Sequence, residues 1–526
     1  MSEVKNIGIV TEVRDGIVVA SGLSGVGYNE MVEVHTTSGE LVSGLALNLE
    51  EASTGIVILG DFSKIKEGDQ ITSTGKQLSI NVSDEILGHI VNPLGKSLEG
   101  DMDYVVKNGE EMLLDKIAPG IIDRKNVNNE KLFTTGIMAI DALIPIGRGQ
   151  RELVIGDRQT GKTSVVMPIV FNQKKSDIFC IYVAIGKKTS QVAYIKSQLE
   201  QLGCMDYTVI VSANASDPAA MQYIAPYAGC AIGEYFAQKG QHALVIYDDL
   251  TKHAWAYREI SLLLKRPAGR EAYPGDIFYL HSKLLERAVQ LSDEKGGGSL
   301  TALPIVETQA DDVSAYIPTN IISITDGQIY LSTDLFNAGY RPAINVGLSV
   351  SRVGGSAQIK AMKKVAGRLK LDLAQTRELQ VFAQFGSDLD DETKQKLVRG
   401  ERLSEILKQD LLDLYELPLQ IAMIYSATNG YLDNVELKDI KRWKKKFVEY
   451  FDKEGSEITK IINDTRDFTE ETEAKMKKLL EEFVLPEDDT AELSMKLRKS
   501  KTSDTETDSQ EIDKKDSSEV ISEDKK

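Results

Sequence analysis

The stretch that most constrains the fold runs from Gly156 to Thr163 and has two glycines and a lysine at fixed spacing. It follows the apolar run Leu153 to Ile155 and opens a helical pattern from Thr163 to Gln173. A strand, a glycine-rich loop and a helix in this order are the setting of a phosphate-binding P-loop. The predicted P-loop residues are Gly156, Asp157, Arg158, Gln159, Thr160, Gly161, Lys162 and Thr163. A β–α turn that binds no ligand is the alternative.

The chemistry of this loop suits the phosphates of a nucleotide. Glycines allow successive backbone N–H groups to turn toward an anion, and the helix N-terminus adds a positive dipole end. The Lys162 ammonium can reach the β- and γ-phosphates, and the Thr163 hydroxyl can bind Mg²⁺.

A second motif lies further along the chain, where the apolar run Ala243 to Tyr247 ends in Asp248 and Asp249. An apolar strand that ends in a carboxylate is the Walker B pattern, whose carboxylate accepts hydrogen bonds from Mg²⁺-bound water. We assign the metal role to Asp248 and a structural role to Asp249. A pair of helix-capping aspartates is the alternative.

Hydrolysis requires a group that orients the attacking water. In one large class of P-loop enzymes this group is a carboxylate at the end of the strand after the P-loop helix. Here the strand Phe179 to Ile185 is followed by Gly186, Lys187 and Lys188. A protonated lysine has no acceptor with which to polarise water. We therefore expect the chain to bind nucleotide with Mg²⁺ and to hydrolyse it poorly, if at all.

An arginine, Arg352, lies among small residues in the run Ser349 to Gly355, far in sequence from the P-loop. Such an arginine can point out of one subunit into the site of a neighbour, where it stabilises negative charge in a transition state. A surface salt bridge or a helix cap is the alternative.

The pattern of the chain divides it into four parts. Residues 1–75 contain short β-branched runs separated by turns, with Asp15-Gly16 and Ser38-Gly39 as hairpin turns, which predict a small β-barrel for assembly. Residues 76–355 alternate strands and helices, which predicts a P-loop α/β domain with a mostly parallel sheet. Residues 356–485 predict a helical bundle, with Met362, Ala366, Leu369 and Leu373 on one face of a helix. Residues 486–526 are charged and poor in large apolar side chains, which predicts disorder.

Composition excludes several classes of function. The net charge of −18 argues against a protein that wraps nucleic acid. No apolar run approaches the length of a membrane span, and the first residues do not resemble a signal peptide. The three cysteines lack metal or redox spacing, and the five histidines form no metal-binding pattern. A reducing, cytoplasmic setting fits this cysteine usage.

Taken together, these motifs resemble the α subunit of F1-type ATP synthase. The resemblance covers about Asn6 to Leu485 and is highly specific. Besides the P-loop, it rests on Gly88 to Gly95, Ile144 to Leu153, Tyr182 to Gly186, Ser261 to Pro267, Pro274 to Ser282, Asn337 to Ala343 and Ser351 to Gly355. It implies a RecA-like central domain.

The resemblance also implies further site residues and partners, with membrane contact only through the complex. Three α-like chains would alternate with three β-like catalytic chains in a hetero-hexamer around a γ-like rotor. The α-like sites would hold Mg-ATP or ADP without turnover, and Arg352 would act as the arginine finger of the adjacent catalytic site. Arg341 and Pro342 would lie against the adenine, and Gln409 would contact the base. The segment Phe385 to Asp390 matches the part that faces the rotor.

The sequence departs from the family pattern at several points. Lys187 replaces a glutamine and would add a second cation near the γ-phosphate. Leu411 replaces the second glutamine of a base-contacting Gln-x-Gln, which puts adenine selectivity in question. The N-terminal helix that docks α subunits to the δ subunit and peripheral stalk has no counterpart, and the acidic tail is extra. These departures favour a paralogue in an F1-like hydrolytic motor without the usual stator, of the kind that resembles gliding motors.

Two other assignments stay open. One is an ordinary proton-coupled ATP synthase. The other is a RecA-type hexameric ATPase that acts on RNA or export substrates, which would need its own water-positioning carboxylate and, for RNA, a basic channel. The sequence leaves the direction of operation, the coupling ion and the membrane partner undecided.

Overall fold

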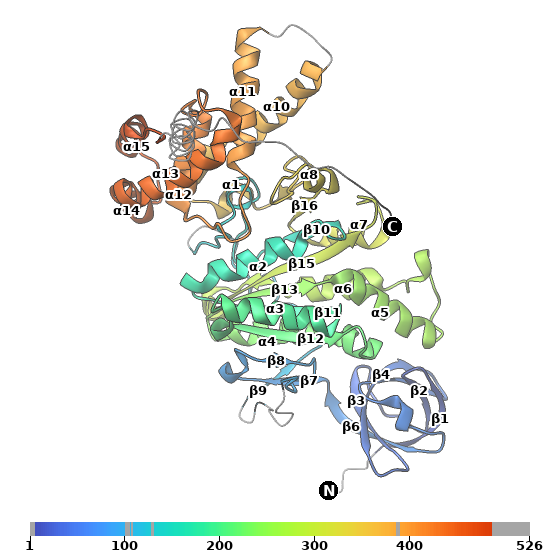
Figure 1. Cartoon of the computed structure of the whole chain (residues 1–526). Helices are drawn as coiled ribbons and strands as arrows, with labels where there is room; N and C mark the ends of the chain where they lie inside the picture. The colour runs from blue at the N-terminus through green and yellow to red at the C-terminus, as the bar shows by residue number, and fades with distance from the viewer. Residues whose placement is uncertain (1–5, 100–105, 107–108, 128–130, 385–389, 487–526) are drawn as a thin grey trace, which may run out of the picture.

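The computed structural model describes residues 6–99, 106, 109–127, 131–384 and 390–486. Figure 1 shows a barrel at one end, a sheet with flanking helices in the middle and a group of helices at the other end. The tail predicted to be disordered lies outside the described residues apart from Pro486, and the segment Phe385 to Asp390, predicted to face the rotor, lies outside them apart from Asp390.

The N-terminal strands close into a barrel in the order β1-β2-β5-β4-β3-β6. Asp15 and Gly16 form the tight turn between the first two strands, as their sequence predicts. Inside the barrel, a side chain at Gly44 would meet Ile56 at 2.6 Å, so the strands approach closely there. The strands are β1 (Ile7–Arg14), β2 (Ile17–Ser21), β3 (Glu30–His35), β4 (Leu41–Leu49), β5 (Thr54–Ile58) and β6 (Gln70–Gln77).

A mostly parallel sheet forms the centre of the molecule. Within the described residues its strands follow the order β17-β16-β10-β15-β13-β11-β12-β8, and β14 pairs with β15. Strands β7 and β9 form a separate antiparallel pair. The bounds are β7 (Ser79–Val82), β8 (Ile90–Val91), β9 (Glu110–Leu113), β10 (Leu153–Asp157), β11 (Ile178–Lys187), β12 (Thr208–Asn214), β13 (His242–Asp248), β14 (Val289–Gln290), β15 (Ser299–Thr308), β16 (Gly327–Leu331) and β17 (Val350–Ser351).

Helices cover both faces of this sheet, which explains why its strands are almost continuously apolar. Along β11, Ile181 and Val183 pack in the buried cluster of α4 to α7, whereas Cys180 and Tyr182 pack in that of α2 and α3. The helices are α1 (Met138–Leu143), α2 (Lys162–Asn172), α3 (Thr189–Gln201), α4 (Ala219–Gln238), α5 (Leu250–Leu263), α6 (Ile277–Leu285), α7 (Tyr316–Ile324) and α8 (Thr333–Asn337).

The C-terminal part is helical, and α12 lies at its centre with nearly every side chain buried. The predicted single helix through Met362 and Leu373 is wrong, because α9 ends at Ala366 and α10 begins at Leu369. Gly367 lies at the break, where glycine lowers helix stability; the four predicted apolar residues are nevertheless all buried together. The helices are α9 (Lys360–Ala366), α10 (Leu369–Gln384), α11 (Asp391–Ile406), α12 (Leu417–Thr428), α13 (Ile440–Glu454), α14 (Ser456–Thr465) and α15 (Glu470–Glu482).

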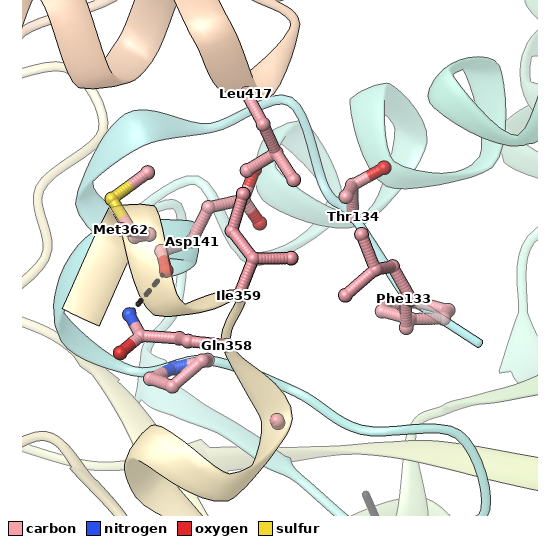
Figure 2. A pocket seen from close by; sticks show the side chains of 10 residues that line it. Phe133, Thr134, Asp141, Gln358, Ile359, Met362 and Leu417 are labelled. Carbon is pink, nitrogen blue, oxygen red and sulfur yellow. Dashed lines mark hydrogen bonds between the residues drawn. The ribbon is translucent and has the colours of Figure 1, made fainter. Parts of the chain in front are cut away.

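The central and helical parts meet at a small cavity of about 20 Å³, which has room for roughly one water. Figure 2 shows side chains from three segments around it, among them Asp141, Gln358 and Leu417. The Gln358 amide donates a hydrogen bond of 2.8 Å to the Asp141 carbonyl. The junction is therefore held by polar contacts as well as by packing.

Among the described residues, the helices are all too short or too polar to cross a bilayer.

Candidate nucleotide-binding site

The loop between β10 and α2 has the shape of a phosphate cradle. A side chain at Gly156 would meet the Leu331 carbonyl oxygen at 2.5 Å, so this position requires glycine beside β16. Gly161 has a φ of +93°, in the left-handed region, and immediately precedes Lys162 at the start of α2. The backbone N–H groups at this helix start lack intrahelical partners and are available to an anion.

The Lys162 ammonium lies within the loop itself. Its Nζ donates hydrogen bonds to the carbonyl oxygens of Gly156, at 2.7 Å, and of Asp157. Burial lowers the pKa of Lys162, and nearby carboxylates, with Glu307 the foremost, oppose that shift. The loop therefore holds a positively charged side chain at the position where the phosphates of a nucleotide would bind.

The loop side chains of Asp157 and Arg158 are directed to the end of β15. The Asp157 carboxylate accepts hydrogen bonds from the Thr308 hydroxyl, at 2.6 Å, and from the Asp311 N–H, at 3.0 Å. Arg158 forms an ion pair with Glu307. Both side chains shape the loop, which leaves the phosphate contacts to its backbone and to Lys162.

Two further predicted loop residues, Thr160 and Gln159, differ in their exposure to solvent. The buried Thr160 hydroxyl donates to the Asp157 carbonyl at 2.8 Å, which closes the turn. Gln159 is exposed and has a φ of +64°.

The predicted metal residues Thr163 and Asp248 are brought together from α2 and β13. The Thr163 hydroxyl lies 3.4 Å from Asp248 Oδ2, which also accepts a hydrogen bond from the buried Tyr182 hydroxyl. The other oxygen, Oδ1, lies 2.8 Å from Lys187 Nζ.

The second aspartate, Asp249, caps α5: its carboxylate accepts a hydrogen bond from the Lys252 N–H, which agrees with the structural role predicted for it. Burial raises the pKa of Asp249 to about 6.

The donor chemistry at this point fits Mg²⁺, which prefers hydroxyl and carboxylate oxygens and retains waters. In the part of the chain that the structure describes, no group of three or more His, Cys, Asp or Glu side chains is arranged to hold a metal ion. Thr163 and Asp248 would therefore hold Mg²⁺ together with nucleotide phosphates. Bound there, the ion would neutralise phosphate charge.

Next to the P-loop is a pocket of about 340 Å³, in the range for small ligands. It contains Arg341, Pro342 and Gln409, the three residues predicted to lie near adenine, and also Leu411. The remaining lining residues are Ile137, Thr160, Gly161, Ser164, Val165, Pro168, Phe336, Ala343, Asp410 and Leu414. The pocket is continuous with the loop because Thr160 and Gly161 belong to both.

The polar groups of Arg341 and Gln409 are already bonded within the chain. The Arg341 guanidinium lies over the Phe336 ring, 3.7 Å from its centroid, and donates to the Phe336 carbonyl at 2.7 Å. The buried Gln409 amide accepts from the Met138 N–H at 2.6 Å and donates to the carbonyls of Gly136 and Asp413. Gln409 thus shapes the wall of the pocket, and for its amide N–H groups to donate to a base one of their present contacts would have to be exchanged.

Comparison with known proteins now identifies the family. The chain is 55% identical to the ATP synthase subunit alpha of Petrotoga mobilis (strain DSM 10674 / SJ95) over 482 residues, which are 92% of this chain and 95% of that protein. The chain belongs to the ATP synthase alpha/beta family. It is also 55% identical to the ATP synthase subunit alpha of Dehalococcoides mccartyi (strain ATCC BAA-2100 / JCM 16839 / KCTC 5957 / BAV1) over 479 residues, 91% of this chain and 94% of that protein.

Models of the ATP synthase alpha/beta family match all three parts of the chain: the beta-barrel domain at residues 3–75, the nucleotide-binding domain at 136–351 and the C-terminal domain at 358–483. The predicted resemblance to an F1-type alpha subunit, a component of an ATP synthase or ATPase complex, is confirmed. The predicted barrel, nucleotide-binding α/β domain and helical domain are confirmed as well.

Within this member of the ATP synthase alpha/beta family, Arg352 lies far from the chain's own P-loop. Ser351 pairs with Gly327 at the start of β16, whereas the P-loop residue Gly156 pairs with Leu331 at its end. A rise of about 3.3 Å per residue separates these two ends by roughly 13 Å. Arg352 is exposed, and its guanidinium donates to the Ile322 carbonyl at 3.3 Å.

Sequence reasoning missed three side chains at the site. Tyr182 projects from β11 onto Asp248, Glu307 lies near the end of β15 beside Lys162, and Phe336 stacks on Arg341. Glu307 carries the same signal as Asp248, a carboxylate after an apolar strand, and this signal was available in the sequence. Tyr182 and Phe336 carry no local signal, because their roles depend on which strands and helices become neighbours.

Proposed function

We propose that this chain is a non-catalytic nucleotide-binding alpha-type subunit of an F1-like rotary ATPase. It binds Mg-ATP or ADP, with phosphates on the P-loop and Lys162, and the base in the pocket beside Arg341 and Pro342. It supplies Arg352 to the catalytic site of a neighbouring β-like subunit. The complex alternates α-like and β-like subunits around a γ-like rotor, lies on the cytoplasmic side, and contacts the membrane only through other subunits.

One observation carries the non-catalytic assignment. At the end of β11, where a hydrolase would hold a water-positioning carboxylate, Lys187 directs its ammonium to Asp248 at 2.8 Å. A group in this ion pair donates hydrogen bonds and has no lone pair with which to accept a proton from water. Nucleotide bound here is therefore retained, because the base that would activate water is missing.

The position of Arg352 supports its role in a neighbouring site. It is exposed at the outermost strand of the sheet order, at the end opposite the P-loop. Ser351 fixes the local backbone, since its hydroxyl donates to the Pro145 carbonyl at 2.7 Å and accepts from the Gly354 N–H at 3.1 Å. A guanidinium held in this way can complete a site that a second subunit supplies.

The direct test of the site is nucleotide binding by the purified full chain and by Lys162→Ala. The wild type should bind ATP, and the variant should lose most of that affinity, because its loop lacks the cation that meets the phosphates. Lys66→Ala removes the charge of an exposed lysine in the barrel and should bind like the wild type. Equal binding by Lys162→Ala and the wild type would contradict the P-loop assignment.

The subunit composition of the native complex separates the two kinds of assembly. A δ-type subunit present in equal proportion to the complex indicates an ordinary stator and favours a proton-coupled synthase. A complex that contains β-like and γ-like subunits without δ favours a specialised hydrolytic motor.

A further inference from the structure

The inference concerns the side chain of Lys187, which is packed against the predicted metal carboxylate. Lys187 is the last residue of β11, and its side chain is 13% exposed. Its Nζ lies 2.8 Å from Oδ1 of Asp248, whose side chain is 4% exposed. A salt bridge that is this well shielded from water is screened far less than a surface pair.

Both oxygens of Asp248 are engaged by donors of the chain itself. Oδ1 meets Lys187, and Oδ2 accepts from the Tyr182 hydroxyl and lies 3.4 Å from the Thr163 hydroxyl. In P-loop proteins a carboxylate at this position helps to hold the metal ion. Here a lysine ammonium is paired with Oδ1, so one of the two carboxylate oxygens that could accept from a metal-bound water is already engaged.

The charge of Lys187 has two consequences for a bound nucleotide. It neutralises the carboxylate that would otherwise attract a divalent cation. The Lys187 ammonium also stays at this carboxylate, which lies next to the Thr163 hydroxyl at the start of α2, whether or not Mg²⁺ is bound. Triphosphate that binds the loop without Mg²⁺ would then meet the Lys162 ammonium and, beside Thr163, a carboxylate whose negative charge Lys187 already balances.

We propose that Lys187 is a resident cation that takes over part of the role of Mg²⁺, so that this site retains ATP with little dependence on the metal. The proposal rests on the proposed nucleotide-binding function and adds a property to the same site. Lys187 acts as a specificity-determining residue, because it decides how strongly metal and nucleotide binding are coupled.

The test measures the dissociation constant of ATP for the purified full chain by titration calorimetry, in excess Mg²⁺ and in EDTA. The ratio of the two constants is the coupling between metal and nucleotide; coupling between two ligands of a protein is typically about 5-fold to 150-fold. For the wild type we expect a ratio below roughly tenfold. In Lys187→Gln, which removes the charge, the ratio should rise by roughly tenfold, mainly through weaker binding in EDTA.

Two matched variants test whether the effect depends on a positive charge at position 187 or on any positive charge nearby. Lys187→Arg retains a cation and should keep the wild-type ratio. Lys188→Gln removes the charge of the exposed neighbouring lysine and should also keep it.

The possible outcomes distinguish this proposal from the proposed function. A wild-type ratio above roughly tenfold overturns the role of Lys187, whatever the variants do. So does an unchanged ratio in a folded Lys187→Gln chain that binds ATP. A wild-type chain that binds ATP in neither condition overturns the nucleotide-binding function itself, and with it the proposal.

Discussion

Met138 donates its backbone N–H to the side-chain oxygen of Gln409 at 2.6 Å, across 271 residues of sequence. Met138 starts α1 in the nucleotide-binding domain, and Gln409 follows α11 in the helical domain. The same Gln409 amide donates to the Gly136 carbonyl at 3.0 Å, so one side chain satisfies two backbone groups of the other domain. Because Gln409 also lines the pocket beside the P-loop, the domain junction and the base pocket share a wall.

Replacing Gln409 with alanine should weaken ATP binding more than phosphate binding. The change leaves the Met138 N–H and the Gly136 carbonyl buried without their partner, at a cost to stability of about 2 kcal/mol or more. The pocket wall then shifts while the P-loop stays intact. Titrating the variant with ATP and with inorganic tripolyphosphate separates the two effects, and we expect loss of affinity for ATP alone.

The control for this experiment is Gln375→Ala, which changes an exposed glutamine on α10. It should bind both ligands like the wild type. An equal loss of ATP and tripolyphosphate affinity in Gln409→Ala would mean that Gln409 supports the P-loop and has no selective effect on the base pocket.

Replacing Arg352 with alanine should lower ATP turnover of the assembled complex by roughly 10³-fold or more, as the loss of arginine fingers does elsewhere. ATP binding to this chain should not change, because Arg352 lies at the opposite end of β16 from its own P-loop. The measurements are steady-state hydrolysis by the complex and ATP titration of the chain.

Two companion variants sharpen the Arg352 test. Arg352→Lys keeps the charge but loses the planar fork, so it should restore only part of the rate. Arg368→Ala removes an exposed arginine from the segment between α9 and α10 and should leave the rate near that of the wild type. Full turnover by the assembled Arg352→Ala complex would exclude the finger role.

The contact between Gln420 and Asp141 should stabilise the junction of the two domains. The Gln420 amide, fully buried on α12, donates 2.8 Å hydrogen bonds to Asp141 Oδ2 and to the Tyr415 carbonyl. Burial raises the pKa of the Asp141 carboxyl, so loss of a donor is costly there. Gln420→Ala should destabilise the protein by about 1–3 kcal/mol.

Amide hydrogen exchange locates this effect. In Gln420→Ala, exchange should accelerate in α12 and around Asp141, while the barrel strands should keep wild-type rates. Gln201→Ala, at the exposed end of α3, is the matched control and should alter neither region. Acceleration spread evenly over the whole chain would argue against a local role at the junction.

Acid should destabilise the central sheet partly through His242. Its ring is buried at the start of β13, with Nδ1 at 2.8 Å from the Ser299 hydroxyl and Nε2 at 2.8 Å from Lys131 Nζ. Burial lowers the pKa of His242 to about 4, against about 6.5 in an unfolded chain. Between these values the unfolded chain binds more protons, so the free energy of unfolding falls as the pH falls, by at most about 3 kcal/mol.

The measurement is the thermal unfolding temperature at pH 7 and at pH 4.5. His242→Gln does not titrate and should lose less stability over this interval than the wild type. His35→Gln, in the barrel strand β3, is the matched substitution and should follow the wild type. If the two variants lost the same stability, acid sensitivity would have to come from other groups.

Much of the architecture follows from local patterns in the sequence. Apolar runs with strand length predicted the buried strands, and Asp15-Gly16 predicted the turn between β1 and β2. The same kind of reasoning failed at Gly367, where a continuous apolar face did not produce a continuous helix. The spacing of apolar residues predicts which side chains become buried. The course of the backbone between them depends on how the helices pack.

The sequence by itself determined the P-loop, the strand-end carboxylate Asp248, the lysine at 187 and the family to which the chain belongs. These features depend on residue type and local spacing, which folding does not alter. Only the tertiary structure decided that Lys187 contacts Asp248. The reason is the strand order: β13 lies beside β11 in register, with Ala184 opposite Asp248, although β12 separates them in the chain. Contacts between distant residues arise from this order, which no local pattern encodes.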